Sequence, residues 1–160
     1  MSHARIARRG AALAILLLST AATACSRAAH DATGPSPAQT QQQRSPVAAT
    51  LGTPFDLRIG QSADVEGTGL RATVTRVADD SRCPIDVVCV WEGDAEVSVR
   101  LERAGRAAVA QLHTSPRAGG LREVEYDGYV VHLDALAPAP HSGRPIPAGD
   151  YVATLTVRAK

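Results

Sequence analysis

Residues 95–102 read Ala95-Glu96-Val97-Ser98-Val99-Arg100-Leu101-Glu102. Apolar and polar side chains alternate along this stretch without a break. A period of two is typical of a β-strand that turns one face to a core and the other to water. The stretch therefore predicts a half-buried strand, and it is the cleanest alternation in the chain.

Similar patterns occur on both sides of this strand. Clear alternation is found at residues 55–59, 129–134 and 151–158, and weaker strand candidates lie at 63–66, 69–77, 107–113 and 121–126. Asp127-Gly128 suits a tight hairpin turn, because both central positions of that turn need a positive φ. Arg103-Ala104-Gly105-Arg106 indicates a slightly longer hairpin loop. No segment after residue 24 has a convincing helical period bounded by caps.

These strands define the expected fold class. Seven or eight short strands with frequent turns fall within residues 53–160. We expect one all-β domain there, an antiparallel β-sandwich of immunoglobulin-like size. A small barrel is the alternative, and the strand order stays open at this point.

The first 24 residues have the composition of an export signal. Arg5, Arg8 and Arg9 precede a short apolar block, and small residues end at Ala24. The apolar block is too short for a membrane span, which needs about 20 residues. Cys25 directly after the small residues predicts a lipoprotein signal with a lipid on Cys25, although ordinary cleavage near Ala24 is the alternative. The protein is then expected in the cell envelope, outside the cytoplasm, on the outer membrane or facing the periplasm if the host has two membranes.

Removal of this leader changes the charge of the chain. The whole sequence has 17 basic and 16 acidic residues, and the leader takes three arginines, which leaves a net charge of −2. A general nucleic-acid-binding role is disfavoured, because it would need a clustered basic surface. Residues 25–52 are rich in Ala, Ser, Thr, Pro and Gln, which predicts a flexible linker between lipid and domain.

Cys83 and Cys89 lie six positions apart, around Pro84. An oxidising compartment favours a disulfide between them. A zinc site with histidines and a redox-active pair are the alternatives, although the spacing is not that of a thioredoxin-like motif. Trp91 is expected to pack beside the disulfide and to give the sandwich a large core side chain.

The segment around these cysteines resembles a known group of proteins. The segment runs Asp80-Ser81-Arg82-Cys83-Pro84, four further residues, Cys89, one residue and Trp91, with Gly93 and Ala95 later, and it is similar to an uncharacterised family of secreted bacterial β-rich domains. Many members of that family resemble lipoproteins. The resemblance extends over residues 55–157 and implies an extracytoplasmic β-rich domain, without an activity to carry over.

Charged residues cluster in the same segment. Calcium takes six to eight oxygen ligands, so a calcium site built from the carboxylates of this loop is one hypothesis. Solvated acidic side chains at strand ends are the simpler hypothesis, and the spacing of the carboxylates is not that of a calcium loop. Arg82 is expected to form a local ion pair with neighbouring carboxylates, or else to present an anion-binding group. Five acidic residues of the segment, together with Arg82 and Trp91, form the expected binding loop. Its members are Asp79, Asp80, Arg82, Asp86, Trp91, Glu92 and Asp94.

Catalytic signals are weak. His132 and Asp134 lie two apart on an expected strand, hence on one face, and a His–Asp pair can orient a general base. No nucleophile elbow, zinc-protease motif or phosphate loop accompanies them. The Pro- and Gly-rich stretch 138–149 is expected to be a crossover or a binding loop.

The sequence thus favours a lipid-anchored envelope β-sandwich with a non-enzymatic binding or scaffolding role and no cofactor. Its expected partners are the membrane, through the lipid, and an envelope protein or small ligand of unknown identity. The alternatives are a calcium- or other metal-binding module, an inhibitor of an envelope enzyme acting through the disulfide loop, and a hydrolase using His132 and Asp134.

Overall fold

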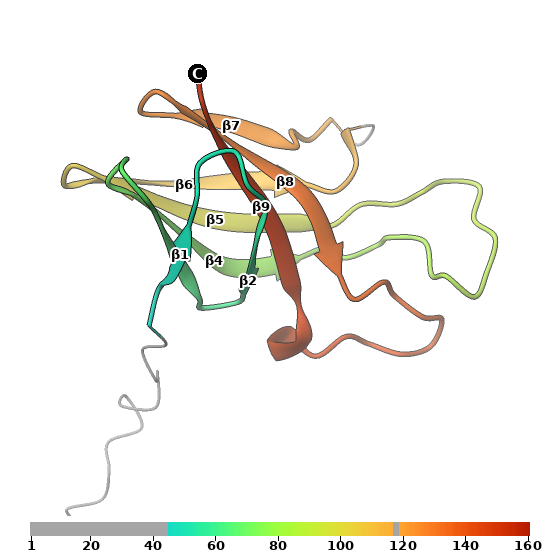
Figure 1. Ribbon diagram of the computed structural model, residues 1–160. Helices are drawn as coiled ribbons and strands as arrows, with labels where there is room; N and C mark the ends of the chain where they lie inside the picture. The colour runs from blue at the N-terminus through green and yellow to red at the C-terminus, as the bar shows by residue number, and fades with distance from the viewer. Residues whose placement is uncertain (1–44, 117–118) are drawn as a thin grey trace, which may run out of the picture. The chain divides into compact units, whose positions relative to one another are not determined.

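The computed structural model describes residues 45–116 and 119–160. This part of the chain forms nine β-strands in two packed sheets (Figure 1). The strands are β1 (Val47–Ala49), β2 (Phe55–Arg58), β3 (Ser62–Val65), β4 (Leu70–Ala78), β5 (Glu96–Arg103), β6 (Arg106–His113), β7 (Glu123–Tyr126), β8 (Tyr129–Ala137) and β9 (Val152–Ala159). The expected signal peptide, with Cys25, lies outside the described residues.

The two sheets divide the strands in an order that the sequence left open. The five-stranded sheet has the order β1-β3-β4-β5-β6, and the four-stranded sheet has the order β2-β9-β8-β7. Neighbouring strands are antiparallel except β1 and β3, which are parallel. The all-β sandwich expected from the sequence is confirmed, with one strand more than the eight candidates.

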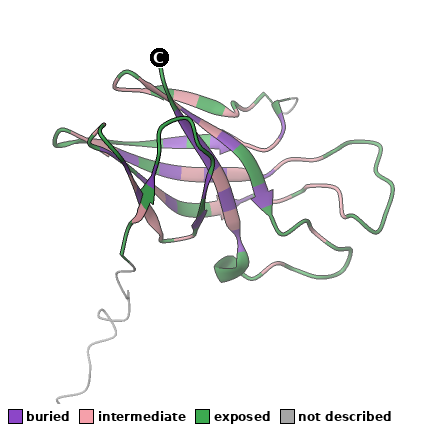
Figure 2. Cartoon of the chain, in the orientation of Figure 1, coloured by how far each residue is buried: buried purple, intermediate pink, exposed green. Residues whose placement is uncertain are grey.

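The core lies between the inner faces of the two sheets. The alternation in β5 buries Val97, Val99 and Leu101, while Leu133 on β8 and Leu155 on β9 face them from the other sheet. Figure 2 shows the buried residues along the strands and the exposed ones in the turns and long loops. The 3-10 turn η3 (Ala148–Asp150) precedes β9, and no helix in the described part of the chain is long or apolar enough to cross a membrane.

Two tight turns join neighbouring strands at one end of the sandwich. Asp127 and Gly128 have φ values of 48° and 88° between β7 and β8, as the expected hairpin requires. The β5–β6 connection is shorter than expected, because Arg103 pairs directly with Arg106. Only Ala104 and Gly105, also at positive φ, form this turn.

The domain begins earlier than residue 53. The expected linker included residues 47–49, but these form β1, which pairs in parallel with residues 63–65 of β3. Ala49 is buried in the core. A three-residue strand shows no alternation of its own, and its partner strand supplies the hydrogen bonds, so the composition of the surrounding stretch was misleading.

Candidate functional site

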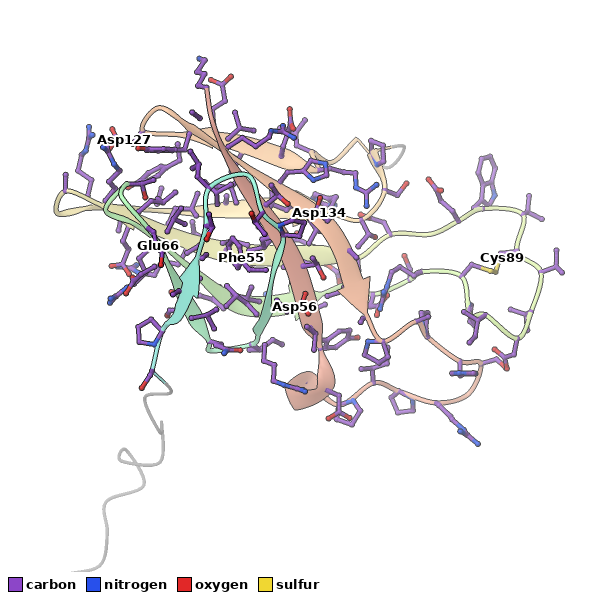
Figure 3. The ribbon with its side chains drawn as sticks, viewed as in Figure 1. Phe55, Asp56, Glu66, Cys89, Asp127 and Asp134 are labelled. Carbon is purple, nitrogen blue, oxygen red and sulfur yellow. A yellow bond between two sulfur atoms is a disulfide. The ribbon has the colours of Figure 1, made fainter. Side chains whose placement is uncertain are left out.

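Two long loops extend from the same end of the sandwich, beyond the ends of the strands (Figure 1). The disulfide loop, residues 79–95, joins β4 to β5, and the proline-rich loop, residues 138–151, joins β8 to β9. Figure 3 shows Cys89 far out in the disulfide loop and well away from the core residue Phe55. The binding-loop residues expected from the sequence therefore lie outside the packed sheets.

The expected disulfide is present. The Cys83 and Cys89 sulfur atoms are 2.08 Å apart and close a ring around residues 84–88. Behind the ring, the N–H of Cys83 donates to the carbonyl of Glu92, and that of Ser81 donates to the carbonyl of Asp94. These bonds continue the pairing of the two chain segments outward from the sheet, so the ring is carried on a hydrogen-bonded stem.

Gly93 is required by the close approach of the two sides of this stem. Its φ is 69°, and a Cβ atom there would come within 1.9 Å of the carbonyl oxygen of Ser81. Any other residue would meet both backbone strain and a backbone clash. The glycine in the cysteine segment therefore has a local structural cause.

Arg82 fixes the base of the disulfide loop. Its Nε and Nη2 donate to the two carboxylate oxygens of Asp80 at 2.8 and 2.7 Å, and Nη1 and Nη2 donate to the carbonyls of Leu136 and Pro138. The hydroxyl of Tyr151 donates to the same carboxylate at 2.8 Å. The local ion pair expected for Arg82 is confirmed, with Asp80 as its partner. All three side-chain nitrogens are engaged by the protein, which leaves the anion-binding hypothesis without support from this geometry.

The charge state of Asp80 follows from the same contacts. Partial burial raises the pKa of its carboxyl, but the hydrogen bonds from Arg82 and Tyr151 outweigh burial and hold the pKa below its ordinary value. Burial and the hydrogen bond to Asp80 raise the pKa of Tyr151. The Asp80 carboxyl is therefore charged at neutral pH. Through Arg82 and Tyr151, it ties the disulfide loop to the ends of β8 and β9.

Asp94 and Glu92, two further carboxylates of the segment, are occupied by separate protein donors. Asp94 accepts bonds from His113 Nδ1 at 2.6 Å, from the Thr114 hydroxyl and from the Ser115 N–H. Burial raises the pKa of Asp94, but these bonds outweigh burial and lower it overall. Glu92 accepts a bond from the Ser115 hydroxyl. Within the described ranges no three His, Cys, Asp or Glu side chains converge as metal ligands would.

Trp91 is not a core residue. The prediction that it packs beside the disulfide inside the sandwich is wrong, because its side chain is 81% exposed. The stem carries the ring beyond the strand ends, so proximity to the cysteines does not bring Trp91 to the core. The exposed apolar side chains of this loop, which we call the apolar tip, are Ile85, Val87, Val88, Val90 and Trp91.

The proline-rich loop supports the tip from one side. Asp86 accepts bonds from the N–H and the hydroxyl of Ser142, and the N–H of Ile85 donates to the carbonyl of Pro140 at 3.0 Å. The Ser142 bonds, with His141 4.0 Å away, lower the pKa of Asp86. An open cleft of about 600 Å³ lies between the loops, and Tyr151 is among the residues that line it.

The expected catalytic pair lies on β8 in the four-stranded sheet, outside the two loops. His132 Nδ1 is 3.1 Å from Asp134, whose second carboxylate oxygen accepts a bond from the Thr156 hydroxyl at 2.6 Å. The prediction that both side chains share one face is confirmed. Thr156 is the cross-strand neighbour of His132, but its hydroxyl donates to Asp134. In the described structure no serine, threonine or cysteine side chain is hydrogen-bonded to His132, so its imidazole has the orienting contact of a general base without a hydroxyl or thiol engaged by it.

Sequence reasoning missed the two features that give this end of the molecule its character. Trp91 was expected in the core, and the exposure of the apolar side chains beside it was not predicted. The contact between Asp86 and Ser142, which lies 56 positions later in the chain, was also not predicted. The valines within the disulfide ring are the signal that could have identified the tip, since so small a ring cannot enclose them.

No family model, curated protein or solved structure matches this chain. Its function therefore has to be inferred from the geometry of the two loops.

Proposed function

We propose that this chain is a lipid-anchored, non-enzymatic binding module of the cell envelope, and that the apolar tip of the disulfide loop docks on a partner protein. The observation that carries the proposal is the exposure of Val88, Val90 and Trp91 on a ring closed by Cys83–Cys89. Val88 is fully exposed, Val90 is 91% exposed, and all three lie within four positions of the chain.

Burial of the apolar tip against a partner would contribute a large favourable free energy to binding. Burying a side chain the size of valine contributes about 1.5–3 kcal/mol relative to leaving it in water. Soluble proteins rarely expose neighbouring large apolar side chains unless they mark an interaction site. A tryptophan among them adds the residue type most often found at the centre of protein interfaces.

The loop is also held in place before any partner binds. The disulfide, the hydrogen-bonded stem and the Asp86–Ser142 contact restrict its conformations. Restricting a loop in advance lowers the conformational entropy lost on binding. The tip is therefore suited to insert as a preformed projection into a concave surface.

Charge favours a protein over a lipid surface as the partner. Between Cys83 and Glu92 the loop carries two carboxylates, Asp86 and Glu92, and no basic side chain. Anionic lipid headgroups attract basic segments and repel acidic ones. We therefore expect an apolar pocket with basic or neutral groups at its rim.

The anchor and the compartment rest on the sequence. The leader, Cys25 directly after small residues and the resemblance to secreted bacterial domains support an envelope lipoprotein, and a disulfide is in keeping with an oxidising compartment. Inhibition of an envelope enzyme is a second candidate, favoured by the same observation, because a convex, disulfide-closed loop is a shape that fits an active-site groove.

Affinity capture with matched variants tests the proposal. The full chain would be used to isolate partners from envelope extracts, and the binding of a purified partner would then be titrated. Val88→Asp should weaken binding at least about tenfold, because burying a charge is unfavourable. Leu121→Asp changes another exposed apolar side chain, 66% exposed and outside the tip, and should bind like the wild type. Equal binding by both variants, or no captured protein above background, would refute the docking site.

A further inference from the structure

The four sheet edges of this sandwich differ in how they are protected. Proteins usually keep exposed edges short or charged, because an open edge can pair with another chain. β1 has only three residues, β2 carries Asp56 and Arg58, and β7 carries Glu123 and Glu125. β6 has eight residues, and residues 107–112 contain neither a charge nor a proline.

The hydrogen-bond direction along β6 follows from its turn. Arg103 and Arg106 flank the two-residue turn and form a hydrogen-bonded pair, so the even-numbered residues of β6 bond to β5. The odd-numbered residues then direct their N–H and C=O groups away from the sheet. His113 confirms this direction, because its N–H donates outward to the carbonyl of Leu121.

Among the described residues, this outer edge is occupied only at His113, whose N–H donates to the carbonyl of Leu121. Near the turn, the Tyr126 hydroxyl donates to the carbonyl of Arg106, an even-numbered residue whose backbone groups face β5. Between these two sites, the outward backbone groups of Ala107, Val109 and Gln111 have no hydrogen-bond partner among the described residues. The side chain of Val109, at the centre, is 61% exposed.

We propose that β6 pairs antiparallel with β6 of a second copy of this chain and joins two five-stranded sheets into one. A two-fold axis through Val109 sets the register. Val109 lies opposite its own copy, and Ala107 lies opposite Gln111 of the other chain. Each outward N–H then meets an outward carbonyl of the copy.

The edge is self-complementary, which favours a second copy over an unrelated strand. A two-fold interface brings each residue to face the same surface on its partner, so like charges near the axis would repel. The segment around Val109 has none, and Arg106 at its end pairs with Asp127, which also pairs with Arg103. The exposed valine gains an apolar neighbour, which is the kind of cross-strand pair that stabilises sheets.

Cysteine cross-linking in the full chain tests both the pairing and its register. Val109→Cys should form a disulfide-linked dimer in envelope membranes, because opposed residues of such a pair have Cα atoms about 5.5 Å apart. Ala107→Cys alone should not cross-link. A mixture of Ala107→Cys and Gln111→Cys chains should cross-link, since the register places these positions opposite each other.

A second measurement uses the mass of the particle in solution. The full chain in detergent should sediment as two protein chains. Val109→Pro removes one outward N–H from each chain without touching the bonds to β5, so it should raise the dimer dissociation constant about tenfold with an unchanged circular dichroism spectrum. Val109→Thr keeps the N–H and should stay dimeric.

Three results would overturn the proposal. These are a single chain by sedimentation, absence of the Val109→Cys cross-link, and a cross-link from Val109→Cys to a different protein. The last would assign this edge to another partner. None of these results bears on the apolar tip, which lies on a different part of the chain.

Discussion

The carboxylate of Asp86 accepts two hydrogen bonds from Ser142, one from its N–H at 2.9 Å and one from its hydroxyl. The two residues are 56 positions apart, in the disulfide loop and the proline-rich loop. This contact joins the loops at the point where the apolar tip begins. It therefore holds the tip in one position relative to the sandwich.

Loss of this contact should loosen the tip without unfolding the domain. In Asp86→Ala, we expect faster amide hydrogen exchange in residues 85–92, because the loop loses its lateral support. We expect little change in melting temperature, because Asp86 is an exposed loop residue. Asp150→Ala removes a carboxylate from the proline-rich loop itself and serves as the control. Exchange rates that match the wild type in Asp86→Ala would show that the disulfide alone orders the loop.

Removal of Arg82 should destabilise the fold more than any change at the tip. In Arg82→Met, the half-buried Asp80 carboxylate and the carbonyls of Leu136 and Pro138 lose their donor, at a cost of roughly 2–3 kcal/mol. Tyr151→Phe removes one hydrogen bond from the same carboxylate and should cost about 1 kcal/mol. Urea denaturation measures both values. If Arg82→Met lowers the free energy of unfolding no more than Tyr151→Phe does, the role assigned to Arg82 is contradicted.

The stability of the domain should fall in acid because of Asp80 and Asp94. Both carboxyls have lowered pKa values in the folded chain. Such a group stabilises the fold above its unfolded pKa, about 3.9, and this stabilisation is lost as the pH falls through the folded pKa. Urea midpoints should therefore be flat from pH 7 to about pH 5 and then drop below about pH 4. In Asp80→Asn the drop should be shallower, and a drop as steep as in the wild type would argue against Asp80.

Trp91 gives a direct optical check on the tip. Since it is the single tryptophan and is 81% exposed, its emission in the folded protein should resemble that of tryptophan in water and should change little on unfolding. Trp91→Ala should alter the free energy of unfolding by less than about 0.5 kcal/mol. A blue-shifted emission in the isolated protein, or a loss of several kcal/mol in Trp91→Ala, would instead place the ring in the core.

The fold could be predicted from the sequence because its causes are local. The alternation at residues 95–102 and the Asp127-Gly128 turn determine side-chain faces and chain reversal within a few residues. β1 escaped prediction because it exists only through its parallel partner, residues 63–65. The strand order likewise depends on contacts between distant segments, which no local pattern encodes.

The candidate site was predicted in part for the same reason. The pairing of Cys83 with Cys89 and that of Arg82 with Asp80 are short-range and follow from charge and redox chemistry. The exposure of Trp91 depends on how far the stem projects beyond the sheet. The support from Ser142 depends on a loop that follows β8. Both are properties of the folded sandwich, so neither could be read from the cysteine segment alone.

Site-specific photo-crosslinking from Val88 tests the docking of the apolar tip most directly. A photoreactive residue at Val88 should give a discrete protein adduct in the intact envelope. The same residue at Leu121, which lies beside the β6 edge, should not give this adduct, and opening the ring by Cys83→Ser with Cys89→Ser should abolish the Val88 adduct. A Val88 probe that labels only lipid or water, or an adduct pattern identical to that from Leu121, would contradict the account.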